Sequence, residues 1–215
     1  MTVDLRSHWD TVYRTNQPQA VSWYQTEARL SLELIRRVAP AANSQILDVG
    51  GGASTLVDGL LAAGYTQVAV LDVSSAGLEH ARARLGESAK RVQWIEGNIL
   101  TVDLSAESID VWHDRAVFHF LTDPRDRQLY VERVRHAVRP GGHVLVATFA
   151  EDGPTRCSGL DVSRYAPDAL HHEFGPDFSL TESAREVHVT PRGVPQAFTY
   201  CLCRYEPNTL ARTAA

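Results

Sequence analysis

Short apolar runs alternate with amphipathic stretches through the middle of the chain. The apolar runs have the length and the Val, Ile and Leu content of buried strands, and they cover residues 45–49, 67–72, 91–95, 109–113 and 143–150. The stretches between them predict helices near 54–63, 75–85 and 124–138. Strands that alternate with helices predict right-handed βαβ units and a parallel sheet.

The two ends of the chain follow other patterns. Ser7, with Asp10 three residues later, predicts a capped N-terminal helix. The other expected elements are a helix at 26–39, a loop at 151–166, a short helix at 168–174, and a strand pair at 179–189 and 196–205. The strand pair predicts an antiparallel hairpin. The expected fold class is therefore α/β, a doubly wound and mostly parallel sheet with a C-terminal antiparallel hairpin.

Length and composition are those of one globular domain. The chain has 215 residues, of which 44% are hydrophobic and 22% charged, so it can bury a single large core. We expect residues 1–44 to form N-terminal helices and a candidate active-site lid. Residues 45–205 would be the core of the same domain, and 206–215 a loose tail.

Charge and hydropathy exclude several classes of partner. The net charge of −5 disfavours nonspecific nucleic-acid binding, which needs a basic surface. No apolar run is long enough for a membrane span, and the N-terminus lacks an apolar signal core. We therefore expect a cytoplasmic protein with no membrane or nucleic-acid partner. Cys201 and Cys203 have no second ligand pair nearby in the sequence, so no metal site is predicted.

One turn carries the strongest chemical signal. The segment 46–55 reads ILDVGGGAST, an apolar strand followed by three glycines and a helix start, and Asp72 closes the next apolar run. In a parallel sheet this order builds a nucleotide-binding crevice at the carboxyl ends of the strands. Gly50, Gly51 and Gly52 let the backbone approach a ligand closely. Asp72 can accept hydrogen bonds from two ribose hydroxyls.

The residues around this turn discriminate among nucleotides. A dinucleotide site uses G-x-G-x-x-G, and here the third glycine position is Thr55. The carboxylate of Asp48 would repel a pyrophosphate, but it suits a ligand that carries an ammonium and a sulfonium, as S-adenosylmethionine does. Two alternatives stay open, a nicotinamide-dependent (NAD) oxidoreductase and a non-catalytic nucleotide-binding module.

Four motifs in register resemble those of the class I S-adenosylmethionine-dependent methyltransferases. They read ILDVGGGAS, VLDVS at 70–74, EGNIL at 96–100 and IDVWHDRAVFHFL at 109–121, and VRPGGHVLVATF follows them. The resemblance implies a seven-stranded, Rossmann-like sheet, with S-adenosylmethionine as cofactor and S-adenosylhomocysteine as product. The implied cofactor-binding residues are Asp48, Gly50, Gly51, Gly52, Ser54, Asp72, Val73, Gly97, Asn98, Ile99, Asp114 and Trp23. Ser54 and Asn98 depart from the family pattern, which often has glycine and aspartate there.

Longer segments resemble a narrower group. The stretch DRAVFHFLTDPRDRQLYVERVRHAVRPGG, with SGLDVSRYAPDALHHEFG downstream, looks like the thiopurine and small-thiol methyltransferases. HWDTVYRTN and VSWYQ resemble both that group and the elongation-factor lysine methyltransferases. We therefore expect a small-molecule acceptor, with a thiol as one option because it is partly ionised near neutral pH. A protein lysine is the alternative acceptor.

Two residues after the fourth strand are candidate catalytic groups. Asp114 lies where that strand opens onto the crevice, and it either contacts the acceptor or cofactor or caps the next helix. His119 can act as a general base, because imidazole titrates near neutral pH. His113 lies inside the strand, where a hydrogen-bonded core histidine is the favoured interpretation.

Candidate acceptor contacts come from loops on the same rim of the sheet, because loops at the carboxyl ends of strands carry function. They are Tyr24, Arg115, Arg156, Cys157 and Tyr165. Trp23 and Tyr24 are expected in the lid, with their aromatic faces near the sulfonium charge. Trp9 and Tyr13 are expected to pack in the core.

Overall fold

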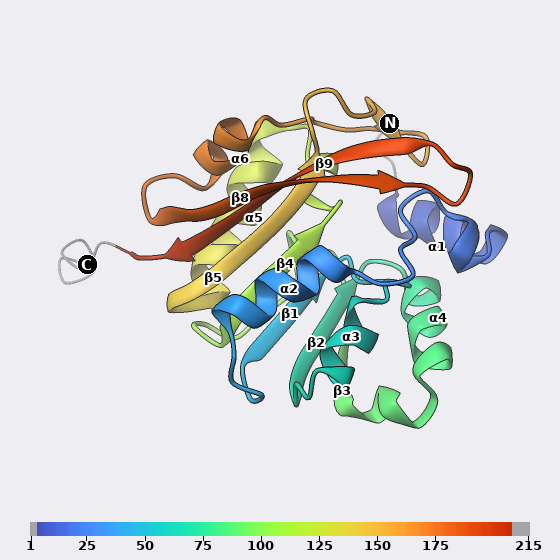
Figure 1. The fold of residues 1–215 in the computed structure, drawn as a ribbon, viewed down its shortest axis with the longest axis horizontal. Coiled ribbons are helices and arrows are strands. Elements are labelled where there is room, and N and C mark those ends of the chain that lie inside the picture. The colour runs from blue at the N-terminus through green and yellow to red at the C-terminus, as the bar shows by residue number, and fades with distance from the viewer. Residues whose placement is uncertain (1–3, 208–215) are drawn as a thin grey trace.

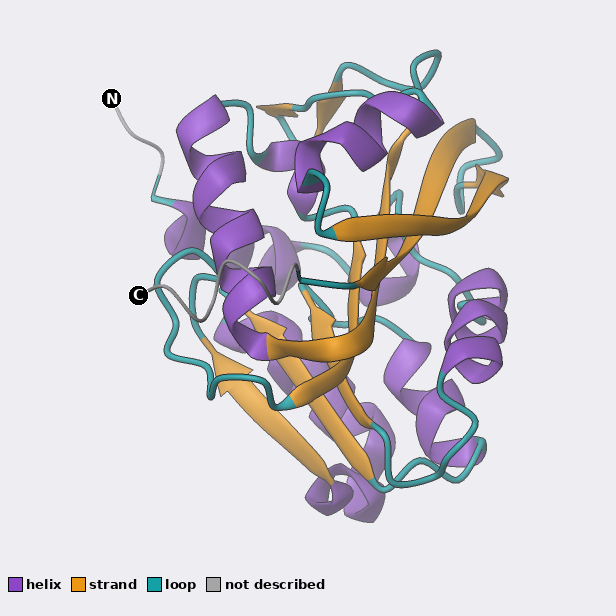
Figure 2. Cartoon of the chain, turned by 90° about the vertical axis from the view of Figure 1, so that its left-hand side faces the viewer, coloured by secondary structure: helices purple, strands orange, loops and turns teal. Residues whose placement is uncertain are grey.

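The computed structural model describes residues 4–207 and contains a seven-stranded sheet with helices on both faces (Figure 1, Figure 2). The strands are β1 (Gln45–Val49), β2 (Gln67–Asp72), β3 (Val92–Glu96), β4 (Ile109–Arg115), β5 (Val138–Phe149), β8 (Phe178–Val189) and β9 (Pro195–Tyr205). Their order is β3-β2-β1-β4-β5-β9-β8. The first five are parallel, and β9 pairs antiparallel with both β5 and β8. The expected α/β fold class is confirmed.

Helices form a layer on each face of the sheet. One layer contains α2 (Arg29–Val38), α3 (Leu56–Ala62) and α4 (Ser75–Leu85), and the other contains α5 (Pro124–Ala137) and α6 (Pro167–Phe174). Successive strand residues point to opposite faces. Ile46 therefore packs in the core with α2 and α3, and Leu47 in the core with α5. Because β1 is buried on both faces, it reads as a continuous apolar run interrupted only by Asp48.

The N-terminal segment covers the rim where the parallel strands end. Helix α1 (Leu5–Thr15) packs against α4, and a 3₁₀ turn (Pro18–Ala20) leads from it toward α2. Further 3₁₀ turns cover Gly86–Arg91 and Phe118–Phe120. The last of these follows β4 and borders the same rim. The sheet thus presents its carboxyl ends to α1 and to the loop after β4.

The structure corrects the expected cap of the first helix. Asp4, not Ser7, is the N-cap, and its carboxylate accepts hydrogen bonds from the backbone N–H groups of Arg6 and Ser7 at 3.1 and 3.3 Å. Asp10, the expected capping-box partner, instead reaches α4. A chain that begins its helix earlier gains a full first turn, and Asp4 satisfies the N–H groups which that turn exposes.

Two further boundaries differ from the expected ones. The expected loop at 151–166 contains a small hairpin, β6 (Arg156–Cys157) paired with β7 (Leu160–Asp161). Its tight turn uses Ser158 and Gly159, which have φ of 50° and 82°. Strand β5 begins before Pro140-Gly141-Gly142 rather than after it. Residues 208–215 of the expected tail lie outside the described residues.

Candidate active site

Two adjoining cavities lie at the carboxyl ends of the parallel strands. The main cavity is lined by residues of α1, of the turns after β1, β2, β3 and β4, and of the loop after β5, namely Leu5, Trp9, Tyr13, Trp23, Val49, Gly50, Leu71, Asp72, Val73, Gly97, Asn98, Ile99, Leu100, Arg115, Ala116, Val117, Phe120, Leu121, Asp126 and Cys157. The turn cavity lies on the other side of the glycine turn and is lined by Tyr13, Pro18, Val21, Trp23, Tyr24, Gln25, Ala28, Ser31, Asp48, Gly50, Gly51, Ala53, Ser54, Thr55, His113 and Arg115.

The glycine turn between β1 and α3 separates these cavities. Gly50 and Gly52 have φ of 68° and 31°, a region that residues with a side chain rarely adopt. A Cβ on Gly50 would lie 2.0 Å from the Cγ2 atom of Val117. The Gly50 and Gly51 N–H groups both donate to the Leu71 carbonyl, at 2.7 and 3.1 Å. The turn is thereby tied to the end of β2.

Both acids that the sequence singled out lie against this turn. A Cβ on Gly51 would be 2.7 Å from Asp48 Oδ2, and one on Gly52 would be 2.7 Å from Asp72 Oδ2. Only glycine lets the backbone pass between the two carboxylates. A ligand that follows the turn therefore meets a carboxylate at each end.

Asp72 ends β2 and faces the main cavity. One of its oxygens accepts the Ser74 N–H at 2.8 Å, and its side chain is almost fully buried. Burial raises the pKa of Asp72 to about 7. The turn after β3 closes this end of the cavity with Gly97, Asn98 and Ile99. The Asn98 side-chain oxygen accepts the Leu100 N–H at 2.9 Å, so this amide shapes its own loop.

Asp48 lies in β1 and faces the turn cavity. Its Oδ1 atom is 2.7 Å from Nδ1 of His113, and Nε2 of His113 is 2.9 Å from the Ser31 hydroxyl. Its Oδ2 atom is buried and has no hydrogen-bond partner among residues 4–207. A buried carboxylate oxygen without a donor is costly. This oxygen therefore suits a cationic group of a ligand.

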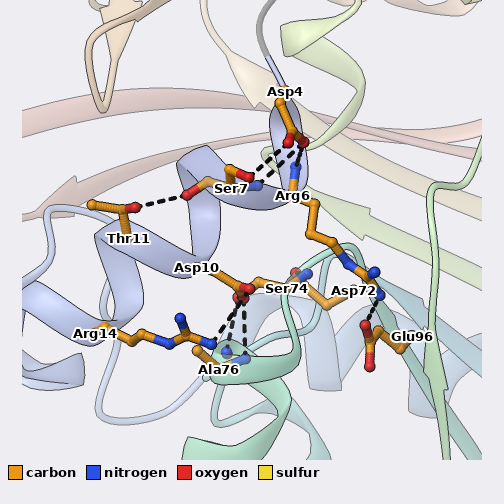
Figure 3. A network of polar contacts seen from close by, with 11 residues as sticks. Asp4, Arg6, Ser7, Asp10, Thr11, Arg14, Asp72, Ser74, Ala76 and Glu96 are labelled. Atoms are coloured by element: carbon orange, nitrogen blue, oxygen red, sulfur yellow. Dashed lines mark hydrogen bonds and ion pairs between the residues drawn. The ribbon is translucent and has the colours of Figure 1, made fainter.

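Figure 3 shows two of the polar contacts that fasten helix α1 over the main cavity. Asp10 accepts hydrogen bonds from the Ser74 hydroxyl at 2.6 Å and from the Ala76 N–H at 3.3 Å, so it also caps α4. Arg6 forms an ion pair with Glu96 at the end of β3. Because Ser74 also bonds Asp72, the helix is connected through one residue to the acid below it.

The aromatic residues of the N-terminal segment lie together in the main cavity. The Trp9 ring meets Trp23 and Phe120 edge to face, with centroids 5.7 and 5.2 Å apart. As expected, Tyr13 is buried in a small core cluster with Ala53 and Ala76, and Trp9 packs against that cluster. Both rings also line the cavity with Trp23. Helix docking on α4 brings them there, which their local spacing does not reveal. Tyr24 lines the turn cavity.

Asp114 is fully buried, and neither cavity includes it in its lining. Its carboxylate accepts the N–H groups of Val117 and Phe118, at 2.9 and 3.0 Å, and the Tyr130 hydroxyl at 2.6 Å. Burial raises its pKa to about 6. This geometry supports the capping role considered for Asp114. It does not support contact of Asp114 with the acceptor or the cofactor.

His119 is also fully buried and outside both linings. Its ring packs against Phe120 and Phe149, and Nδ1 accepts the Phe149 N–H at 3.4 Å. Burial lowers the pKa of His119 to about 3, so the ring is neutral at neutral pH. A general base must reach the proton that it removes, and from this position His119 does not reach the cavity.

The candidate acceptor contacts divide into two groups. Arg115 and Cys157 line the main cavity, and burial raises the pKa of the Cys157 thiol to about 11. Arg156 points to its own hairpin, where it pairs with Asp161 at 3.1 Å. Tyr165 packs on Phe118 and is absent from both linings. These two residues are held away from the cavities by contacts within the β5–α6 loop.

Most of the expected cofactor contacts line one of the two cavities. Those in the main cavity are Gly50, Asp72, Val73, Gly97, Asn98, Ile99 and Trp23, and those in the turn cavity are Asp48, Gly50, Gly51, Ser54 and Trp23. Gly52 lines neither and instead gives space to Asp72 and Tyr13. The sequence interpretation missed Leu5, Phe120 and Ser31. Phe120 lies within the fourth motif, whereas Leu5 and Ser31 enter through tertiary packing and have no motif.

Comparison with known proteins agrees with this geometry. Residues 46–142 match a family model described as a methyltransferase domain. Uncharacterized methyltransferases of Mycobacterium tuberculosis and Mycobacterium bovis are 29% identical over 131 residues. This alignment covers 59% of the chain and 60% of each relative, so it spans less than two thirds of their length.

Solved structures share the fold over nearly the whole chain. One, from work on the conversion of a disulfide bond into a thioacetal group during echinomycin biosynthesis, has a TM-score of 0.75 at 17% identity and covers 97% of this chain and 96% of that chain. An S-adenosylmethionine-dependent methyltransferase from Anabaena variabilis has 0.73 at 14% identity, covering 95% and 96%. The 1,6-didemethyltoxoflavin-N1-methyltransferase of Burkholderia thailandensis, with bound 1,6-didemethyltoxoflavin and S-adenosylhomocysteine, has 0.69 at 18%, covering 94% and 88%.

Residues 46–142 thus match a methyltransferase domain, and the chain has the fold of the class I S-adenosylmethionine-dependent methyltransferases. The family model and the shared fold both confirm the resemblance carried by the four sequence motifs. Between residues 4 and 207, no helix has the length and apolar character needed to cross a membrane. Within that range, no cluster of three or more His, Cys, Asp or Glu side chains is arranged as a metal site.

Proposed function

We propose that this protein transfers a methyl group from S-adenosylmethionine to a small apolar acceptor whose nucleophile is a thiol. The observation that carries the proposal is the glycine turn held between two buried acids, one of which has an oxygen without a partner. A ligand with a ribose and an ammonium at opposite ends matches that pattern. A pyrophosphate beside Asp48 would not.

The residues present fit the cofactor in two parts. Asp72 would hold the ribose hydroxyls, while Asn98 and Ile99 would border the base in the main cavity. Asp48 would hold the ammonium of the amino-acid half in the turn cavity. When bound, S-adenosylmethionine supplies a methyl carbon activated by its sulfonium. The chain then has to align the nucleophile with that carbon and exclude water, and such positioning can supply several kcal/mol, about 7–11 at most.

The acceptor side of the main cavity supports a nucleophile that needs no base. Its lining contains no histidine or lysine, and its carboxylates are Asp72 and Asp126. Because Asp72 is assigned to the ribose, Asp126 is the remaining carboxylate. An amine or hydroxyl needs a base to remove its proton, whereas a thiol with a pKa of about 8.5 is already partly ionised at neutral pH. A thiol acceptor therefore fits this lining.

The enclosure of the cavity supports a small molecule. Trp9, Tyr13 and Trp23 of the N-terminal segment line it, and Phe120 joins them through its contact with Trp9. An acceptor of this class would be bound by apolar and aromatic contact. Among the structures of similar fold, one binds the small molecule 1,6-didemethyltoxoflavin and another comes from work on disulfide chemistry. A lysine side chain of a protein would have to enter beneath α1.

The test uses purified protein with isotope-labelled S-adenosylmethionine and three acceptor sets: small aromatic thiols, matched amines and phenols, and protein from a lysate. We expect label in the thiols, and loss of transfer in Asp72→Asn but not in Asp126→Asn. Label in protein lysines, or amine methylation that requires Asp126, would contradict the acceptor proposal. A thermal shift with NAD but not with S-adenosylhomocysteine would contradict the proposed cofactor. At a concentration of one hundred times Kd, S-adenosylhomocysteine should raise the free energy of unfolding by about 2.7 kcal/mol.

A further inference from the structure

Asp48, His113 and Ser31 form a chain of hydrogen bonds that joins three elements. Asp48 comes from β1, His113 from the neighbouring β4 and Ser31 from the helix α2 that covers them. The two contacts are 2.7 Å between Asp48 Oδ1 and His113 Nδ1, and 2.9 Å between His113 Nε2 and Ser31 Oγ. The three residues are 2%, 3% and 1% exposed, so this chain is shielded from bulk water.

The chemistry of the partners fixes the direction of the bonds. A carboxylate only accepts, so Nδ1 of His113 carries the proton that Asp48 receives. In the neutral ring Nε2 is then an acceptor, and the Ser31 hydroxyl donates to it. Asp48 thus sets the tautomer, Ser31 fixes the orientation of the ring, and the ring holds one oxygen of Asp48. The other oxygen, Oδ2, stays directed at the glycine turn, next to Gly51.

The same three residue types form the triad of serine hydrolases, but this arrangement presents a different end. In a hydrolase the serine faces the substrate. Here Ser31 lies within α2, and its hydroxyl bonds His113. The buried atom without a partner among residues 4–207 is Oδ2 of Asp48. The chain therefore offers a ligand an oriented negative charge instead of a nucleophile. A cation that reaches the turn cavity is the matching group.

We propose that His113 and Ser31 are positioning residues that aim Asp48 Oδ2 at the ammonium of the amino-acid half of S-adenosylmethionine. This rests on the proposed function, in which Asp48 takes the ammonium. The orientation restrains a carboxylate that would otherwise be free to rotate, so less order has to be imposed when the ligand binds. Loss of His113 or Ser31 should therefore weaken binding of the amino-acid half of the ligand and leave binding of the adenosyl half unchanged.

The experiment compares two ligands that share the adenosyl half. S-adenosylhomocysteine has the amino-acid half, and 5′-methylthioadenosine lacks it. Dissociation constants for both are measured by calorimetry for the unaltered protein and for Ser31→Ala, His113→Phe and His113→Asn. His113→Phe should weaken S-adenosylhomocysteine about tenfold, which is typical for loss of a hydrogen bond to a charged group, and Ser31→Ala should weaken it about fivefold, because its bond is to the neutral ring. Both should leave 5′-methylthioadenosine within about twofold. His113→Asn keeps a donor near the Nδ1 position and should recover part of the loss.

Val111→Ala is the matched control, because Val111 is fully buried on the same strand and face as His113. It should lower stability without changing the ratio of the two affinities. Equal weakening of both ligands in Ser31→Ala and His113→Phe would show a merely structural role and overturn the proposal. Ser31→Ala removes a single oxygen, so it remains measurable if His113→Phe does not fold.

Asp48→Asn separates this proposal from the proposed function. If it changes the affinity ratio while the Ser31 and His113 variants do not, the ammonium assignment holds and the positioning role is wrong. If Asp48→Asn leaves the ratio unchanged, the ammonium assignment itself is wrong. If all these variants lower the ratio together, both proposals are supported.

Discussion

Gly50, Gly51 and Gly52 bring the backbone into contact with side chains of three other parts of the fold. The atoms closest to their absent Cβ positions belong to Val117 at Gly50, to Val70 and Asp48 at Gly51, and to Tyr13 and Asp72 at Gly52. Positive φ and lack of space act together at Gly50 and Gly52. Single atoms therefore decide the geometry of the site, because one added methyl group at Gly51 or Gly52 would displace a carboxylate.

We predict that Gly52→Ala weakens S-adenosylhomocysteine at least about tenfold, because an affinity loss of this size needs only about 1.4 kcal/mol. The new methyl group would lie 2.7 Å from Asp72 Oδ2 and 2.5 Å from the Tyr13 hydroxyl. Gly64→Ala is the control, since Gly64 has φ of 91° but no atom within 4 Å of its Cβ position. It should lower stability by about 1–2 kcal/mol through backbone strain and leave affinity unchanged. Equal affinity losses in both variants would contradict the steric account.

The affinity for S-adenosylhomocysteine should rise with pH up to neutrality. Burial raises the pKa of Asp72 to about 7, and the ionised carboxylate accepts hydrogen bonds from the ribose hydroxyls on both oxygens, whereas protonation turns one of these oxygens into a donor. At pH 6 roughly one molecule in eleven has the binding-competent form, so the apparent Kd should be about tenfold weaker than its limit at high pH. Calorimetry from pH 5.5 to 8.5 measures this, and Asp72→Asn should flatten the profile.

The stability of the free protein should change in the opposite direction. A carboxyl group whose pKa is raised on folding contributes stability at low pH and loses it as pH rises from the unfolded value toward about 7. Burial also raises the pKa of Asp114, to about 6, so Asp114 likewise contributes less stability as pH rises. The ligand-induced increase in Tm should therefore grow over the range in which these two groups destabilise the free protein. A ligand effect independent of pH would contradict the role of Asp72.

At the scale of elements, α1 serves as a cover that is fixed by its polar side. Asp10 links it to the start of α4, and Arg6 links it to the end of β3. Its apolar side supplies Leu5, Trp9 and Tyr13 to the main cavity. We expect a cofactor that binds beneath it to be released when these contacts open. The fastening of α1 should therefore govern the rate of exchange more than the bound geometry.

We predict that Asp10→Ala speeds dissociation of S-adenosylhomocysteine about tenfold, the effect of losing a charge-assisted hydrogen bond of about 1.5–3 kcal/mol. Stopped-flow displacement, followed by tryptophan fluorescence, measures the rate. Thr11→Ala is the control, because its hydroxyl bonds only the Ser7 carbonyl of the same helix. Unchanged dissociation in Asp10→Ala would show that α1 does not need to move.

At the scale of the whole molecule, Glu186 joins segments from three parts of the chain. It pairs with Arg115 of β4 at 3.3 Å, accepts from Gln25 at 3.1 Å and accepts from the Tyr200 hydroxyl at 2.9 Å. The Arg115 guanidinium also lies 4.0 Å from the centre of the Phe198 ring. The C-terminal hairpin thereby supports an arginine that lines both cavities.

Replacing Glu186 by Gln should lower the free energy of unfolding by about 1–3 kcal/mol, because a buried guanidinium loses its counter-charge. Denaturant unfolding measures the change. Glu182→Gln is the control on the same strand, since Glu182 pairs with the half-exposed Arg37. Such a pair contributes at most about 1 kcal/mol. Similar losses in the two variants would contradict a special role for Glu186.

The sequence predicted the parts of the fold that local pattern determines. The parallel strands, the C-terminal hairpin and the glycine turn follow from apolar runs and glycine placement, and Asp72 lines the main cavity at the end of β2. Trp9 and Tyr13 pack in the core as expected, but their place in the cavity lining could not be predicted, because it depends on how α1 docks on α4. Asp114 sits at the motif position expected to face the cavity, yet the N–H groups of Val117 and Phe118 turn its carboxylate inward.

Strand β9 follows every other strand along residues 4–207, yet it lies between β5 and β8. The hydrogen-bonding edge of β5 therefore stays open in a nascent chain until residues 195–205 have been synthesised. An apolar strand edge of this kind is a template for pairing with another polypeptide. A chain that ends before Pro195 would lack β9, the strand that joins β8 to β5. We expect such a chain to aggregate through the open edge of β5.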